Sequence, residues 1–223
     1  MTEMLIYGAG GFAREVAQLV RDLAGCGAPI TLKGFLSDDA STHGTSVAGL
    51  PVLGGGEYLK AHSGRFDVAI GIGTPAVKRR LTPLVLAHAK SCPVLVHPTV
   101  VSSSSVMLGT GTIVCAGSIL TVDIVVGDFV TINLACTVGH DSRLLDYVTL
   151  APSVNISGNV TVAEGTDVGT GSRIIQGKRI GHWSIIGAGA VVTTDTPDNC
   201  TAVGVPARPV KFREPDWHLP TSS

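Results

Sequence analysis

Residues 120–150 read LTVDIVVGDFVTINLACTVGHDSRLLDYVTL, and an aliphatic residue stands at every sixth position of this stretch. The same spacing runs from Leu108 to Val192, and every member of the series is Leu, Ile or Val. Four residues after each member stands a residue that is usually small or β-branched, with Lys178 as the exception. A period of six is neither the helical period of about 3.6 nor the alternation of a strand. It predicts a parallel β-helix, in which each hexapeptide forms a short strand, buries one aliphatic side chain and turns one corner.

The length of the repeat also bears on assembly. Three hexapeptides make one triangular coil of about 18 residues, so residues 108–192 predict between four and five coils. A β-helix this short exposes apolar side surface unless copies pack side by side, and three-fold packing suits a triangular prism. We therefore expect a homotrimer.

The residues before the repeat alternate between β-rich and helical patterns. The β-rich runs are residues 4–7, 30–36 and 66–70, and helical patterns follow the first and the third. Such alternation predicts a parallel sheet with crossover helices. We therefore expect a Rossmann-like α/β module over residues 1–92, a β-helix over residues 93–212 and a C-terminal tail over residues 213–223.

Glycine or aspartate clusters follow all three β-rich runs: Gly8-Ala9-Gly10-Gly11, Ser37-Asp38-Asp39 and Gly71-Ile72-Gly73-Thr74. Parallel sheets bind ligands at the carboxyl ends of their strands, and a Gly-rich turn before a helix lets backbone amides meet a phosphate. Asp38 or Asp39 can accept hydrogen bonds from a ribose or a base. A module of about 90 residues is half of a full dinucleotide fold, which favours a mononucleotide. The alternatives are a plain tight turn for the first cluster and a solvated turn or helix cap for the aspartates.

One loop of the repeat, which begins at Asn133, carries a histidine beside a carboxylate. His140-Asp141 is the only such neighbouring pair in the repeat. An imidazole with an ordinary pKa near 6.5 accepts a proton at neutral pH, so His140 is a candidate general base. The alternative is a surface histidine at a corner of the prism.

Composition excludes several other classes. The net charge is −1 and there is no basic block, so we expect no nucleic-acid partner. The five cysteines form no CxxC pair, which indicates buried, reduced thiols and a cytoplasmic protein. We expect no signal peptide at residues 1–6 and no membrane span. His140 and His182 are seven hexapeptides apart and so on different faces, and we expect no metal site.

The closing stretch AVGVPAR, residues 202–208, completes a resemblance to the left-handed β-helix acyltransferases of the hexapeptide-repeat superfamily. The stretches GAGGFAREV (residues 8–16), FLSDD (35–39) and AIGIGTPAVKRR (69–80) narrow it. Over residues 3–212 the chain resembles bacterial sugar O/N-acetyltransferases typified by sialic acid O-acetyltransferase and the bacillosamine-pathway N-acetyltransferase. The resemblance implies the left hand of the coil, acetyl-CoA as cosubstrate, and a nucleotide-linked amino sugar as acceptor. It also implies a role in bacterial surface-glycan synthesis, such as that of the O-antigen of lipopolysaccharide.

The resemblance also implies roles for single residues. The base of the family falls on His140, with Asp141 as its acidic neighbour. A second histidine of the family, in contact with the coenzyme, is replaced here by Thr149. The expected substrate contacts are Gly10, Gly11, Phe12, Asp38, Asp39, Gly73, Thr74, Lys78 and Asn133, and the expected coenzyme contacts are Thr149, Gly158, Gly187, Ala188 and Arg208.

The expected reaction is direct attack on the thioester by the amine of a 4-amino-4,6-dideoxyhexose carried by UDP or GDP. Two alternatives stay open. One is an O-acetyltransferase of the sialic acid type, which uses the same parts on a hydroxyl group. The other is a non-catalytic hexapeptide-repeat module for assembly or nucleotide sensing, which would not need a base in the corner loop.

Overall fold

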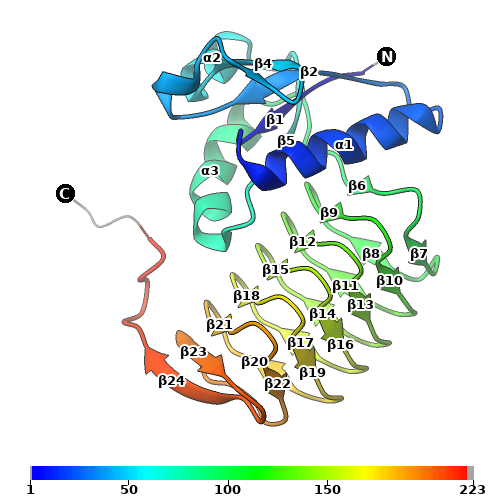
Figure 1. Cartoon of the computed structure of the whole chain (residues 1–223), viewed down its shortest axis with the longest axis vertical. Coiled ribbons are helices and arrows are strands. Elements are labelled where there is room, and N and C mark those ends of the chain that lie inside the picture. Colours follow the sequence, from blue (N-terminus) through cyan, green and yellow to red (C-terminus); the bar gives the residue numbers. More distant parts are fainter. Residues whose placement is uncertain (1, 220–223) are drawn as a thin grey trace.

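A computed structural model describes residues 2–219 as an α/β module seated on one end of a coil of short strands (Figure 1). The module consists of β1 (Thr2–Tyr7), α1 (Gly11–Gly25), β2 (Ile30–Leu36), the short 3-10 helix η1 (Ala40–Thr42), β3 (Ser46–Val47), β4 (Leu50–Gly54), α2 (Gly56–Ala61), β5 (Asp67–Ile70) and α3 (Pro75–His88). Its strand order is β3-β4-β2-β1-β5, and all pairs except β3–β4 are parallel. The chain leaves β1 first toward β2 and later returns on the other side to β5. The point where the order reverses therefore lies between β1 and β5, which is where such sheets bind ligands.

The coil has three parallel sheets, which we call sheets I, II and III. Sheet I contains β7 (Val101–Ser102), β10 (Ile119–Leu120), β13 (Thr137–Val138), β16 (Asn155–Ile156), β19 (Arg173–Ile174) and β22 (Val191–Val192). Sheet II contains β8 (Met107–Leu108), β11 (Val125–Val126), β14 (Arg143–Leu144), β17 (Thr161–Val162) and β20 (Arg179–Ile180). Sheet III contains β6 (Leu95–Val96), β9 (Ile113–Val114), β12 (Thr131–Ile132), β15 (Thr149–Leu150), β18 (Asp167–Val168), β21 (Ile185–Ile186), β23 (Cys200–Val203) and the antiparallel β24 (Arg208–Phe212).

The hexapeptide series forms the core of this coil. Its members from Val114 to Val192 are all buried and belong to one apolar cluster, with Leu108 packed against it. The residue four positions after each aliphatic residue usually also points into the core. Where it is Ser or Thr, its buried hydroxyl donates a hydrogen bond to a backbone carbonyl in the next 18-residue turn of the coil. Ser118 does so to Asn133 (2.8 Å) and Thr166 to Gly181 (2.9 Å). The polar members of the repeat are therefore satisfied inside the core, as buried hydroxyls must be.

Each corner of the prism is turned by a residue with positive φ. At the corner between sheets I and II these residues are Asp123, Asp141, Asn159 and Gly177, with φ values of 55°, 59°, 56° and 70°. Asp, Asn and Gly tolerate this left-handed region better than other residues. The corner therefore selects for the residue types found there, and Asp141 belongs to that series.

The module sits on the coil through α1 and α3 (Figure 1). Leu19 of α1 shares an apolar cluster with Ile113 of β9, and Leu81 of α3 shares one with Phe129 and Tyr147 at the corner between sheets II and III. Residues beyond β24 run back toward α3, where the His218 ring stacks on Trp183 with 3.5 Å between ring centroids. The C-terminal segment thus adds to the contact between module and coil.

Four of the five cysteines are buried, but Cys26 at the end of α1 is exposed, which corrects the expectation that all five are buried. All five are free thiols. Cys136 lies fully inside the coil, as its repeat position predicts. Of the helices within residues 2–219, none combines the length and the apolar character that a membrane crossing requires.

Candidate active site

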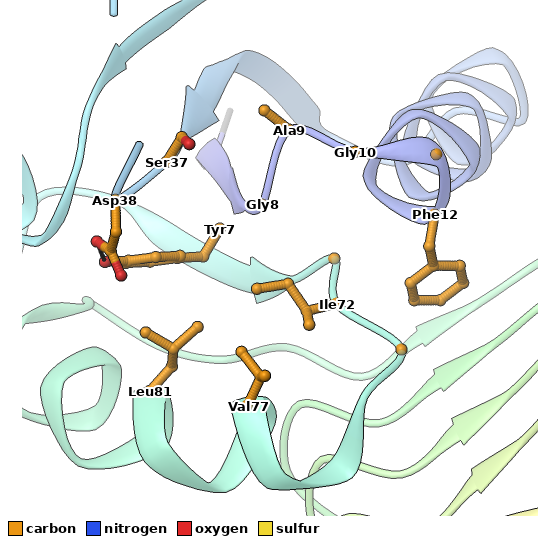
Figure 2. Close-up of a pocket in the computed structure, with 13 residues that line it drawn as sticks. Tyr7, Gly8, Ala9, Gly10, Phe12, Ser37, Asp38, Ile72, Val77 and Leu81 are labelled. Carbon is orange, nitrogen blue, oxygen red and sulfur yellow. Dashed lines mark hydrogen bonds between the residues drawn. The ribbon is translucent and has the colours of Figure 1, made fainter. Parts of the chain in front are cut away.

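A cavity of about 410 Å³ opens at the carboxyl ends of β1, β2 and β5 (Figure 2). Its walls are Tyr7, Gly8, Ala9, Gly10, Gly11, Phe12, Ser37, Asp38, Gly71, Ile72, Gly73, Val77 and Leu81. The structure thus brings the three predicted clusters together at one edge of the sheet. Gly8 shows how closely they meet, because a Cβ built on it would lie 2.9 Å from the carbonyl oxygen of Gly71, and its φ is +117°.

Asp38 and Tyr7 form one end of this cavity (Figure 2). The Tyr7 hydroxyl donates to Asp38 Oδ1 at 2.5 Å, and burial together with this hydrogen bond raises the pKa of Tyr7, which keeps the phenol protonated. Among residues 2–219, Asp38 Oδ2 accepts no hydrogen bond, and Asp38 lines the cavity as an available acceptor. Asp39, in contrast, caps η1 by accepting from the backbone N–H of Ser41 at 3.0 Å, so the cap interpretation is correct for this second aspartate.

The Gly-rich turn forms the middle of the cavity and leads into α1. Gly10 is the N-cap of α1 and offers no side chain to the free N–H groups of the first turn. Unsatisfied amides at a helix N-terminus bind phosphate groups. Phe12 lies at the end of the cavity opposite Asp38 (Figure 2). The cavity therefore offers an acceptor for a base or ribose, amides for phosphates, and apolar walls between them.

Lys78, Thr74 and Thr149 lie outside the cavity walls, although the sequence predicts them as binding residues. Thr74 is the N-cap of α3 and is exposed. Lys78 is 1% exposed, and its ammonium donates to Thr149 Oγ1 at 2.9 Å. Burial lowers the pKa of Lys78 to about 7, and the Asp167 carboxylate opposes part of this shift. Both Lys78 and Thr149 are thus enclosed where module meets coil, and neither presents its side chain to a ligand.

The histidine pair lies at the corner between sheets I and II, between β13 and β14. His140 Nδ1 and Asp141 Oδ2 are 2.7 Å apart, and both side chains are more than half exposed. Because a carboxylate only accepts hydrogen bonds, Nδ1 carries the proton and Nε2 of the neutral ring carries the free lone pair. The pair therefore has the arrangement of a base that a carboxylate orients.

Gly158 lies directly beneath this imidazole. A Cβ built on Gly158 would collide with Nε2 of His140. At intervals of 18 residues along this corner the equivalent positions are Val122, His140 itself, Gln176 and Thr194, so the backbone at this corner accepts side chains. The glycine leaves room for the ring.

The remaining predicted residues occupy other parts of the coil. Asn133, Gly187 and Ala188 lie at the corner between sheets III and I, and Arg208 begins β24. The cavity adjoins sheet III, because the carbonyl of Gly73 accepts from Thr149 of β15 at 2.6 Å. His140 lies at the corner opposite that sheet. Within one chain, the cavity and the imidazole therefore lie on different sides of the coil. Within residues 2–219 no three His, Cys, Asp or Glu side chains are grouped to hold a metal ion.

Comparison with known proteins identifies the family of the chain. The PglD N-terminal domain family matches residues 3–83. The GDP-perosamine N-acetyltransferase of Escherichia coli O157:H7 is 31% identical over 214 residues, covering 92% of this chain and 95% of that protein. The chain belongs to the hexapeptide-repeat sugar acetyltransferases.

Solved structures of two relatives resemble this acetyltransferase along nearly its whole length. The acetyltransferase domain of PglB from Neisseria gonorrhoeae FA1090, in complex with acetyl coenzyme A, has a TM-score of 0.85 at 34% identity and covers 93% of this chain and 98% of its own. PerB from Caulobacter crescentus, in complex with CoA and GDP-perosamine, has a TM-score of 0.82 at 32% identity and covers 94% of this chain and 97% of its own. These likenesses confirm the fold class, an α/β module followed by a left-handed β-helix, and the expectation of an acyltransferase.

Sequence reasoning missed Tyr7, Val77 and Leu81 among the residues that line the cavity. The sequence does carry a signal for Tyr7, because it is the last residue of the first β-rich run and directly precedes the Gly-rich turn. The aliphatic residues carry no comparable signal, since apolar positions on a helix are ordinarily core residues.

Proposed function

We propose that this chain transfers the acetyl group of acetyl-CoA to the amine of a nucleotide-linked 4-amino-4,6-dideoxyhexose, with His140 as general base. The observation that carries the proposal is an exposed imidazole whose Nδ1 is held by Asp141 and whose Nε2 is free. The cavity at the strand ends supplies the second requirement, a site for a nucleotide. The relatives named for GDP-perosamine make GDP the first nucleotide to test, with UDP as the alternative.

The reaction needs no covalent enzyme intermediate. The sugar amine attacks the thioester carbonyl, Nε2 of His140 takes the proton that the nitrogen loses, and the C–S bond breaks to release CoA as a thiolate, which takes up a proton. In this proposal a backbone N–H at Gly158 stabilises the oxyanion that develops at the thioester carbonyl. Binding both substrates side by side supplies much of the rate enhancement. Asn133 contacts the acceptor sugar, and Gly187, Ala188 and Arg208 contact the coenzyme.

The positions of cavity and imidazole support a shared site in a homotrimer. A nucleotide sugar held by the module lies over sheet III, whereas His140 of the same chain lies at the opposite corner. A neighbouring copy in three-fold packing brings its corner between sheets I and II toward this module. Exposed apolar residues on sheet I, Val101 (63%) and Ile119 (42%), give such packing a surface to bury.

The biological setting follows from the substrate. Nucleotide-linked sugars are made and used in the cytoplasm, and the five free thiols are compatible with that compartment. We therefore place the enzyme in the cytoplasm, as a step in the synthesis of a surface glycan such as the O-antigen.

An assay of CoA-thiol release tests the proposal. Acetyl-CoA is offered with GDP- and UDP-linked 4-amino-4,6-dideoxyhexoses and, as matched controls, with the same nucleotides carrying a hydroxyl at carbon 4. We expect thiol release with an amino sugar and only background release with its hydroxyl counterpart. Release with the hydroxyl sugars alone would instead indicate an O-acetyltransferase, and nucleotide binding without any release would indicate a non-catalytic module.

A further inference from the structure

Lys78 is buried without a partner of opposite charge at salt-bridge distance among the described residues. It projects from α3 onto the outer surface of sheet III, where its ammonium donates to Thr149 Oγ1 (2.9 Å), Val148 O (3.2 Å) and Thr131 Oγ1 (3.2 Å). Burying an ammonium is costly unless its protons are satisfied, and three neutral acceptors satisfy them here. All three acceptors belong to the coil, so Lys78 joins the two parts of the chain.

Thr149 extends this contact to the nucleotide cavity. A hydroxyl has one proton to donate, and an ammonium cannot accept it. The Thr149 hydroxyl therefore accepts a hydrogen bond from Lys78 and donates its own proton to a different acceptor. It donates to the carbonyl oxygen of Gly73 at 2.6 Å, and Gly73 lines the cavity.

The contacts of Gly73 and Gly71 show what else holds the loop that receives this bond. A Cβ built on Gly73 would meet nothing within 4 Å, so no side chain packs on the glycine there. On the other side, the backbone N–H of Gly71 donates to Tyr7 O at 2.8 Å, which fixes the start of the loop to β1. The loop is thus held by the sheet at Gly71 and by the coil at Gly73.

We propose that Lys78 and Thr149 form a latch that fixes the nucleotide-binding loop Gly71–Gly73 on the coil, which makes them positioning residues for the acceptor. This inference rests on the proposed function. Neither side chain touches the cavity, so both act through the carbonyl of Gly73. The latch sets where a bound nucleotide sugar lies relative to the coil and to any reacting group carried by a coil packed beside it.

Thr131 provides a matched control for Thr149. Both are threonines on sheet III, paired one coil apart, and both accept from Lys78. Only Thr149 also bonds to Gly73. Thr149→Val and Thr131→Val thus each remove one acceptor from Lys78 with the same change of shape, and only the first releases the loop. A purely structural role would make the two variants alike.

The test compares wild type with Thr149→Val, Thr131→Val, Thr149→Ser and Lys78→Met. Calorimetry gives the Kd for GDP and UDP, steady-state kinetics give kcat and the KM of each substrate, and thermal melting gives stability. We expect Thr149→Val and Lys78→Met to weaken nucleotide binding and raise the KM of the nucleotide sugar by about tenfold, because small misplacements of a bound group are costly. The KM of acetyl-CoA should stay unchanged, Thr149→Ser should behave as wild type, and Thr131→Val should lower only the melting temperature.

Equal nucleotide affinity in Thr149→Val and Thr131→Val would overturn the latch. So would a wild-type protein that binds neither GDP nor UDP. The Kd values for GDP and UDP are measured without any reaction. A wild type that binds nucleotide but releases no CoA would therefore contradict the proposed function, and the Kd values of the variants would still test the latch.

Discussion

Replacing His140 with alanine should lower kcat by about 10²–10⁴-fold, which is the usual contribution of a positioned general base. The loss follows from removing Nε2, the nitrogen that takes the proton of the attacking amine. The side chain is 52% exposed and belongs to no apolar cluster of the coil, so the β-helix should fold as before. The measurement is kcat with saturating acetyl-CoA and the best nucleotide-linked amino sugar. Because an amine can arrive already deprotonated, the loss can fall at the low end of the range.

Circular dichroism and the Kd for nucleotide provide the controls for this variant. Both should match the wild type, because the cavity lies on the other side of the coil in the same chain. A variant that keeps nearly wild-type kcat would remove His140 from its role as base. The corner would then be an ordinary surface corner that happens to carry a histidine.

Replacing Gly158 with alanine should lower kcat by about 10²-fold, because an ångström of misplacement at a reacting centre can cost that much. The added methyl group collides with the tip of a side chain, Nε2 of His140, so the ring must move. The backbone has no need to move, since the coil carries Val122 and Gln176 at the equivalent positions. The expected result is a folded protein with a displaced base.

A double variant separates this cause from general damage to the corner. If Gly158→Ala acts through the imidazole, it should cost almost nothing further in a chain that already lacks His140. Such non-additivity is the sign of residues that act as one unit. Losses that multiply in the double variant would contradict the displaced-base account and would indicate a separate contribution of Gly158, such as contact with the coenzyme.

The coil could be predicted from sequence in almost every respect because its core repeats. Each hexapeptide buries its aliphatic residue in the same way, so the pattern around Leu120 predicts the same local structure as the pattern around Val138. The strand pairs found at intervals of one coil, such as Thr131 with Thr149, follow from the period alone. The hand of the coil does not follow from the period, and it came from the family resemblance.

The nucleotide cavity was also within reach of sequence reasoning, because parallel strands place their carboxyl ends at one edge. Which of Asp38 and Asp39 lines the cavity could not be predicted from the sequence. Which of two adjacent carboxylates faces a cavity and which caps a turn depends on the path of the chain, here set by η1. The pair β3–β4 and the helix α2 were not predicted, since runs this short leave no clear period.

The contact between module and coil lay beyond sequence reasoning. The hexapeptide count shows that Thr149 faces outward, but it does not say that α3 covers it. Lys78 resembles an exposed helix residue beside Arg79 and Arg80, and only the packing of α3 on sheet III buries it. The same packing puts the cavity on one side of the coil and His140 on the other.

The central claim is that the cavity of one copy and the imidazole of another form a single site, and mixed trimers test it most directly. His140→Ala keeps the cavity and loses the base. Gly10→Asp keeps the base and places a carboxylate at the start of α1, where it caps the helix and repels a phosphate. The two inactive variants are co-expressed with different tags, and trimers that carry both tags are isolated and assayed for CoA release.

If sites are shared, trimers that carry both tags should recover about a third of wild-type activity, because one of the three neighbour pairs in each such trimer joins an intact cavity to an intact imidazole. Recovery of that order from two inactive parents would establish the shared site. Mixed trimers with no activity above either parent, or a wild type that sediments as a monomer, would contradict it.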